Sequence, residues 1–313
     1  MTRRFITILL TLHAALPALH AQKDDTGYQF LEVPTSAHSA ALGGMNVSII
    51  EDDATLMFTN PALITNVSDK TLNLNFTSYI SSSNKLSAAF IKQSGERGTW
   101  GIGAMMLNYG EMTETNQDFE TIGTFSAKDI DIQGGYTYLF NDKWSGGVQG
   151  KILMSNYGEY SSTALAVDLG LNYYDTDHGL SLSIVGLNFG GQIDALYEKT
   201  EKLPFNLVAG ISKDLANAPI RISVTFDNIT NWDEKKPINH LTFGADVFPS
   251  NTTWVAIGYN PRRGNEMKIS ESKHGAGLSL GAGLMLNKFK VGLAWGKYHV
   301  AASSLTINTS YTF

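Results

Sequence analysis

The stretch Leu305-Thr-Ile-Asn-Thr-Ser-Tyr-Thr-Phe313 alternates apolar and polar residues up to the last residue of the chain. Successive side chains of a β-strand point to opposite faces, so this period of two predicts a strand with one apolar and one polar face. About ten alternating residues is the length that a tilted strand needs to cross a bilayer. The stretch therefore indicates a membrane-spanning strand. Its terminal aromatic residue, Phe313, resembles an outer-membrane assembly signal.

The same alternation recurs upstream, for example over residues 71–77, 129–137, 164–173 and 220–227. These segments are nearly twice as long as the five or six residues usual in soluble strands, which disfavours the alternative of a soluble β-sandwich. Short connections near 140–143, 174–179, 214–219, 248–251 and 287–288 alternate with long polar ones near 110–127, 190–203, 228–239 and 260–273. We therefore expect an all-β fold: a transmembrane antiparallel barrel of about fourteen strands over residues 70–313, with the long loops outside.

The first residues indicate export. Arg3 and Arg4 precede an apolar run from residue 5 to residue 12, and small residues follow as far as Ala21. This order is typical of a secretory signal peptide, here residues 1–21. After the first twenty residues no apolar run is long enough for a transmembrane helix. We expect an integral outer-membrane protein after cleavage.

Composition excludes several kinds of site. The chain has no cysteine, so disulfides and thiol chemistry are absent, and its net charge of −6 does not fit nucleic-acid binding. Gly275-Ala-Gly277 and Gly281-Ala-Gly283 continue a strand pattern and do not form a dinucleotide loop. We expect no catalytic residue, metal or cofactor, and the protein is not expected to be an enzyme. An outer-membrane hydrolase remains a disfavoured alternative, since its residues need not lie close in sequence.

Some polar and aromatic residues allow more than one interpretation. Asp52-Asp53 fits a solvated acidic turn better than a cation site. His178, His240 and His274 fall in expected turns or loops and should be solvated. Four tryptophans near expected strands are candidates for the interfacial aromatic belts, although some could instead be core residues. They are Trp100, Trp144, Trp254 and Trp295.

Residues 22–69 do not follow the barrel pattern. Thr35 or Ser36 can cap a short helix that runs to Ala41, and Gly43 or Gly44 can end it. Asn60-Pro61 is a second helix start, with asparagine as the cap and proline at the first position. A barrel of about fourteen strands needs a lumen plug unless it conducts, and this segment has a suitable size. The alternative is a loose periplasmic tail.

The run from Tyr28 to Gly44, followed by Asp53 and Asn60-Pro61-Ala62-Leu63, resembles the N-terminal region of the PorV/PorQ family, and is more similar to its PorQ branch. These are outer-membrane barrels of the type IX secretion system, related to the FadL fatty-acid transporters. The specific part of the resemblance is limited to about residues 28–63. Its motif residues in the plug are Pro34, Leu42, Gly43, Gly44, Asn60, Pro61 and Ala62.

The resemblance implies a non-enzymatic scaffold that tethers PorZ at the cell surface beside PorU and PorV. Secreted cargo is there attached to anionic lipopolysaccharide. The alternative is a FadL-like transporter of hydrophobic small molecules. Polar outer loops favour protein contact over lipid capture. The candidate partner-binding residues on these loops are Glu111, Glu114, Asp118, Glu198, Lys199, Trp232, Arg262 and Arg263.

Overall fold

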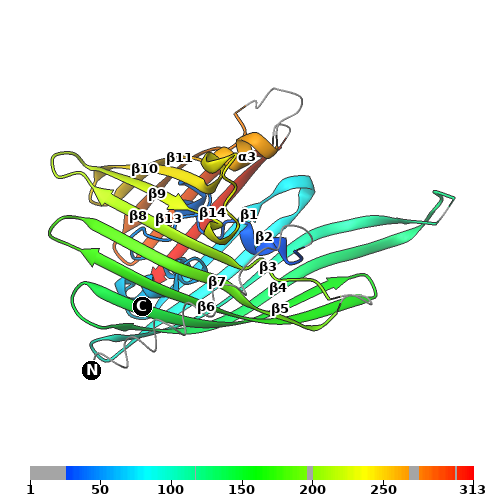
Figure 1. Ribbon diagram of the computed structural model, residues 1–313, viewed down its shortest axis with the longest axis horizontal. Coiled ribbons are helices and arrows are strands. Elements are labelled where there is room, and N and C mark those ends of the chain that lie inside the picture. The colour runs from blue at the N-terminus through cyan, green and yellow to red at the C-terminus, as the bar shows by residue number, and fades with distance from the viewer. Residues whose placement is uncertain (1–25, 117, 196–199, 268–274, 300–301) are drawn as a thin grey trace.

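The barrel is closed. The computed structural model describes residues 26–116, 118–195, 200–267, 275–299 and 302–313, and these form fourteen antiparallel strands, each paired with its neighbours in the chain (Figure 1). Strand β1 (Thr71–Ser78) also pairs with β14 (Ala302–Thr312), in a register from Thr71 opposite Thr312 to Ser78 opposite Leu305. The expected barrel of about fourteen strands is confirmed.

The other strands follow in chain order. They are β2 (Asn84–Ser94), β3 (Gly98–Thr115), β4 (Thr121–Leu139), β5 (Trp144–Tyr157), β6 (Tyr160–Asp175), β7 (Leu180–Asp194), β8 (Asn206–Asp214), β9 (Ile220–Phe226), β10 (Leu241–Ser250), β11 (Thr253–Tyr259), β12 (Leu278–Leu286) and β13 (Phe289–His299).

The two faces of the wall divide as the alternation predicts. On β6, Leu165 and Leu169 are exposed on the outer surface, whereas Asp168 is fully buried on the lumen side. On β4, Asp131 is likewise buried and Ile132 is exposed. An outer apolar surface matches lipid, and a polar inner face can hydrogen-bond to the chain inside the lumen.

Two of the predicted long loops are wrong in their boundaries. Residues 110–127 are mostly strand, because β3 runs to Thr115 and β4 begins at Thr121. Residues 190–194 belong to β7. Both stretches are rich in polar residues, which led to the prediction of loops. The five short connections overlap their predicted positions, although residues 174–175 and 248–250 belong to strands.

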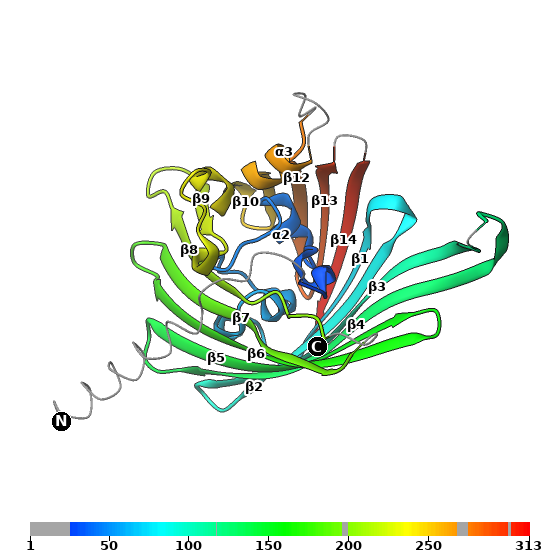
Figure 2. The same cartoon turned by 45° about the vertical axis from the view of Figure 1, so that its right-hand side comes forward.

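Residues 28–67, named here the hatch, lie inside the barrel (Figure 2). The hatch contains η2 (Gln29–Glu32), α2 (Ala37–Ala41), η3 (Ala54–Phe58) and η4 (Pro61–Asn66). Helix α2 packs against β11 to β14, and η4 packs against β3 to β6. The hatch therefore contacts opposite sides of the wall.

Wall glycines let the hatch approach. A Cβ on Gly258 would lie 2.1 Å from the backbone nitrogen of Gly43, and one on Gly147 would lie 2.5 Å from the carbonyl carbon of Pro61. On Gly281 it would lie 2.6 Å from the Cβ of Ala41, as expected for a glycine that makes room for the plug. Only glycine fits where two backbones approach this closely.

No helix among the described residues is long and apolar enough to span a membrane. The signal peptide predicted over residues 1–21 lies outside the described residues. Trp100 and Trp144 are exposed on the outer surface, where each packs beside a tyrosine of the neighbouring strand, as interfacial belts require. Trp254 instead packs against the hatch.

Candidate functional site in the lumen and its wall

Side-chain N-caps begin the short helices of the hatch. Ser36 Oγ accepts the backbone N–H of Ser39 and begins α2. Asn60 Oδ1 accepts the N–H of Ala62, 2.9 Å away, and Asn60 Nδ2 donates to the carbonyl of Val47. The predicted asparagine cap and first-turn proline are confirmed, although η4 is a 3-10 helix.

The other motif residues of the hatch contact the wall. Pro34 is buried, and Leu42 packs against Gly244. Gly43 and Gly44 follow α2 with φ of 98° and 100°, which favour glycine. The carbonyls of Pro61 and Ala62 accept hydrogen bonds from wall hydroxyls of β4 and β5. These residues act in packing and hydrogen bonding between the hatch and the barrel.

His38 joins the hatch to the wall. Its Nδ1 lies 2.6 Å from Glu51 of the hatch and its Nε2 lies 2.7 Å from Asp246 of β10. The ring stacks on Trp254 of β11, with ring centroids 3.9 Å apart. Burial lowers the pKa of His38, but the two carboxylates outweigh it and raise this pKa to about 10. His38 is therefore an imidazolium at neutral pH.

The prediction that Asp52-Asp53 forms a solvated turn is wrong. Asp52 Oδ2 lies 2.5 Å from Lys290 Nζ of β13 and also accepts from Ser68. Burial raises the pKa of Asp52. The hydrogen bonds from Lys290 and Ser68 outweigh this effect, so the pKa lies below its usual value. Asp53 caps η3 by accepting the N–H of Thr55, and burial raises its pKa to about 6. Tertiary contacts therefore engage both carboxylates, although Asp52 remains 31% exposed.

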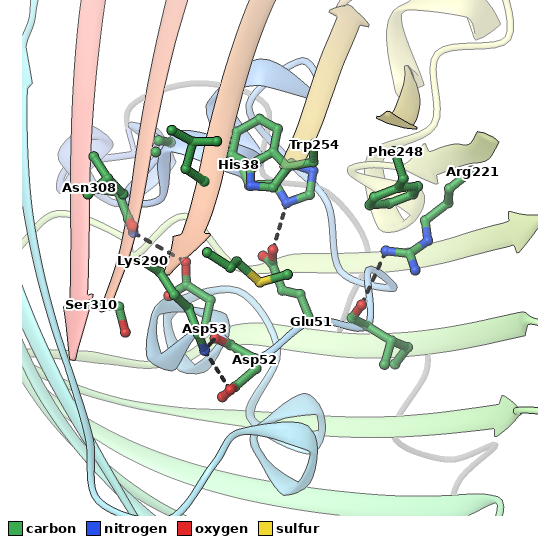
Figure 3. Close-up of a pocket in the computed structure, with 16 residues that line it drawn as sticks. His38, Glu51, Asp52, Asp53, Arg221, Phe248, Trp254, Lys290, Asn308 and Ser310 are labelled. Atoms are coloured by element: carbon green, nitrogen blue, oxygen red, sulfur yellow. Dashed lines mark hydrogen bonds and ion pairs between the residues drawn. The ribbon is translucent and has the colours of Figure 1, made fainter. Parts of the chain in front are cut away.

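These residues border a pocket of about 230 Å³ (Figure 3). It lies between the hatch and the ends of β10 to β14 nearest the short turns, the end expected to face the periplasm. Trp254 and Phe248 supply aromatic surface on one side, and Asn308 and Ser310 supply polar groups on the other. The pocket therefore has an apolar side and a polar side.

A second buried cluster lies on the inner faces of β5, β6 and β7. Lys151 Nζ lies 2.6 Å from Asp168 Oδ2 and donates to Asn188 Oδ1. Asp168 Oδ1 accepts the backbone N–H of Asn188 at 2.7 Å. Asn188 Nδ2 donates to the carbonyl of Pro204. Asn188 has a φ of 59°, and it lies in a β-bulge where two residues of β7 oppose Asp168 alone.

At this bulge the ladder between β7 and β8 ends. Their last pair is Leu187 with Asn206, and among the described residues β7 continues to Asp194 with only β6 as its partner. The chain before β8 turns inward, so that Leu203 is buried beside Phe30 of the hatch in the hydrophobic core. We call the unpaired edge of β7 beyond Leu187 the wall break.

Apolar groups surround the wall break on both sides. Phe189 and Ile193 are each 65% exposed on β7, and Phe189 makes an edge contact with Phe205. Behind them, Leu153 and Ala166 on the inner faces of β5 and β6 belong to the same core cluster as Phe30. Apolar side chains therefore lie both on the outer face of the wall break and in the buried core that reaches the hatch.

Two predicted partner-binding residues turn inward. Arg262 pairs with Glu32 of the hatch at 3.0 Å and with Asp227 at 3.7 Å. Arg263 donates to the carbonyl of Gly43 and lies over the ring of Tyr298. Both lie in the short helix α3 (Pro261–Glu266), which packs against β10 and β13. Both side chains therefore contact the hatch, and their role in partner binding stays a prediction.

Other candidates remain at the surface. Glu111, Glu114 and Asp118 are exposed on the β3–β4 hairpin, beyond the last pairs of β3 with β2 and of β4 with β5. Phe119, which the sequence analysis did not select, is 90% exposed at its tip. Trp232 is partly exposed and stacks on His240. Glu198 and Lys199 lie outside the described residues.

Four further predictions concern three histidines and the last residue. His178 is exposed, as expected. The prediction for His240 is wrong, because it is buried and its Nε2 accepts the backbone N–H of Asp233. His274 lies outside the described residues. Phe313 is exposed, follows the end of β14 and makes an edge contact with Tyr311.

Sequence reasoning did not identify His38, Lys151 or Asn188. His38 and Glu51 are 13 residues apart, but Asp246 is 208 residues from His38. One signal was available for Lys151: a lysine at a lumen-facing position opposite acidic strands requires a partner. Nothing in the local pattern marked Asn188 as the site of a bulge.

Comparison with known proteins shows a similarity of fold. No family model matches the chain, and no curated protein matches it. The Pseudomonas putida toluene transporter TodX matches with a TM-score of 0.58 at 13% identity, over 89% of this chain and 97% of the transporter. The monoaromatic hydrocarbon channel CymD matches with a TM-score of 0.58 at 15% identity, over 90% and 98%. A Pseudomonas aeruginosa FadL homologue matches with a TM-score of 0.56 at 11% identity, over 90% and 99%. The fold is that of the FadL-type outer-membrane barrels.

Proposed function

We propose that this barrel admits small hydrophobic molecules through the outer membrane. The wall break carries the proposal. Barrels of the same fold include a toluene transporter and a monoaromatic hydrocarbon channel, so such cargo suits the architecture. The proposal is the FadL-like alternative raised by the sequence.

An unpaired strand edge is costly in lipid, because exposed backbone N–H and C=O groups have no water to bind there. The β7–β8 ladder ends at Leu187, so the edge of β7 beyond it is such an edge. It would be stable only beside an opening or above the bilayer, where water can reach its backbone groups. Phe189 and Ile193 place apolar surface at that edge, and Phe30 and Leu203 continue it inward. A hydrophobic solute would enter from the outer leaflet along these apolar side chains, beside the buried Lys151–Asp168 pair.

Uptake of labelled toluene by cells that lack other FadL-type barrels tests this. Phe189→Asp and Ile193→Asp place a charge at the wall break and should reduce uptake several-fold at equal barrel level. Phe119→Asp is the matched control, since it also adds a charge at an exposed aromatic but lies at the β3–β4 tip. Uptake no higher than with an empty vector, or equal loss in all three variants, contradicts the proposal.

A second candidate is the non-enzymatic attachment scaffold of the type IX secretion system. The PorV/PorQ resemblance implies it, and the β3–β4 hairpin favours it, because two strands that project beyond their neighbours can reach a soluble partner. In this role the barrel would hold PorZ beside PorU and PorV, amid lipopolysaccharide. Exposed Glu111, Glu114 and Asp118 would contribute to the contact.

Shortening the hairpin between Asn108 and Ala127 separates the two candidates. The scaffold requires loss of surface PorZ with normal barrel level, whereas transport requires unchanged toluene uptake. Retained PorZ removes the scaffold candidate. Cleavage after Ala21 before outer-membrane insertion is part of both proposals, and N-terminal sequencing of the mature protein tests it.

A further inference from the structure

The charged groups that line the periplasmic pocket between the hatch and β10 to β14 already have partners. His38 contacts Glu51, Lys290 contacts Asp52, and Arg221 contacts Asp214. Asp53 is in no ion pair among the described residues, but its carboxylate accepts hydrogen bonds from Thr55, Asn73 and Asn308. An ionic ligand would have to displace one of these partners. The pocket therefore suits a neutral molecule.

Its accessible apolar surface suits a flat ring. Trp254 and Phe248 face the pocket together with Leu284 and Met285 (Figure 3). An engineered cavity of about 150 Å³ is known to bind benzene in another protein. The volume here, about 230 Å³, leaves room for one benzene ring and a small substituent. A long acyl chain does not fit this volume.

One polar group at the pocket lacks a partner. Ser310 lines the pocket on β14 and is only 3% exposed, and its hydroxyl has no hydrogen-bond partner among the described residues. A buried hydroxyl without a partner is destabilising, so a ligand hydroxyl that pairs with it gains binding free energy. Figure 3 places Ser310 across the pocket from Trp254.

We propose that this pocket binds a neutral single-ring aromatic molecule with one hydroxyl group, with the ring against Trp254 and Phe248 and the hydroxyl on Ser310. The inference rests on the proposed transport function, to which it adds a binding site on the periplasmic side of the hatch. Solutes of this class would pause there before release.

Calorimetric titration of the full barrel in nanodiscs, with empty nanodiscs subtracted, tests the site with phenol and toluene as probes. Phenol should bind more tightly than toluene. Ser310→Ala should weaken phenol binding about three- to tenfold, the range of one net hydrogen bond, and leave toluene within about twofold. Met285→Trp fills the mouth and should abolish binding of both probes. Ser304→Ala is the control: it removes a buried inward hydroxyl of the same strand outside the pocket.

Equal binding of phenol and toluene to the unaltered barrel overturns the role of Ser310. Phenol binding that survives Met285→Trp overturns the site, provided that the variant keeps the folded-barrel mobility of the parent in unheated gels. The transport proposal fails separately. Phenol binding with the expected variant pattern but no toluene uptake leaves the pocket and removes transport, whereas uptake without binding removes the pocket alone.

Discussion

His38 of the hatch stacks on Trp254 of the wall, with ring centroids 3.9 Å apart and planes 11° from parallel. The same ring lies between Glu51 and Asp246. One side chain thus links α2 to β10 and β11 through an aromatic face and two carboxylates. Any movement of α2 away from β10 and β11 has to break these contacts.

The His38 contact makes hatch stability depend on pH. The pKa of His38 is raised from 6.5 to about 10 in the folded protein, so its stabilisation is complete below pH 6.5 and is lost as the pH rises toward 10. We expect the melting temperature to be constant from pH 6 to 6.5 and then to fall. His38→Gln should flatten this decline, and an unchanged decline in that variant contradicts the assignment.

Replacing Asn60 with alanine should loosen the hatch without unfolding the barrel. The change removes the cap of η4, worth about 0.5–2 kcal/mol, and leaves the Val47 carbonyl without its donor. Hydrogen exchange should accelerate over residues 47–67 while the β-strand amides remain protected. Equal acceleration in the strands would show that the hatch and barrel unfold together.

Gly258 should not tolerate a methyl group. A Cβ there meets the backbone of Gly43 at 2.1 Å, and overpacking of this kind typically costs about 1–3 kcal/mol. Gly150 is the matched control, because a Cβ there has no neighbour within 4 Å. Gly258→Ala should lower the thermal stability of the barrel and expose the hatch to protease, whereas Gly150→Ala should leave both unchanged.

Removing only one charge of the Lys151–Asp168 pair should lower the free energy of unfolding more than removing both charges. Their side chains are 3% and 0% exposed, so Lys151→Met leaves an uncompensated buried carboxylate, at about 3–5 kcal/mol. Adding Asp168→Asn should recover much of the lost stability. Urea unfolding of the single and double variants measures this, and simple additivity of the two changes would argue against a coupled pair.

The chain lacks cysteine, so single cysteines can report topology. Glu114→Cys on the β3–β4 hairpin should react with an impermeant maleimide on intact cells. Asn217→Cys, in the short turn between β8 and β9, should react only after the outer membrane is opened. The reverse pattern would invert the barrel.

The sequence by itself determined the barrel and the local form of the hatch. Alternation with a period of two is a local property, so the lipid-facing and lumen-facing residues of β6 and β14 could be assigned without a structure. The Asn60 cap is equally local, since Asn60 and Ala62 are two residues apart. Polar composition was a weaker guide, as it hid the β3–β4 hairpin inside a predicted loop.

Only the tertiary structure decided where the charged side chains lie. Closure of the barrel brought Asp246 to His38, Lys290 to Asp52 and Glu32 to Arg262, pairs separated by more than two hundred residues. The wall break depends equally on distant parts, because Asn188 is held by Asp168 and Pro204. Local patterns specify which face a residue occupies. The partner across the lumen depends on strand register and on how deep the hatch lies, and both are set by packing of the whole barrel.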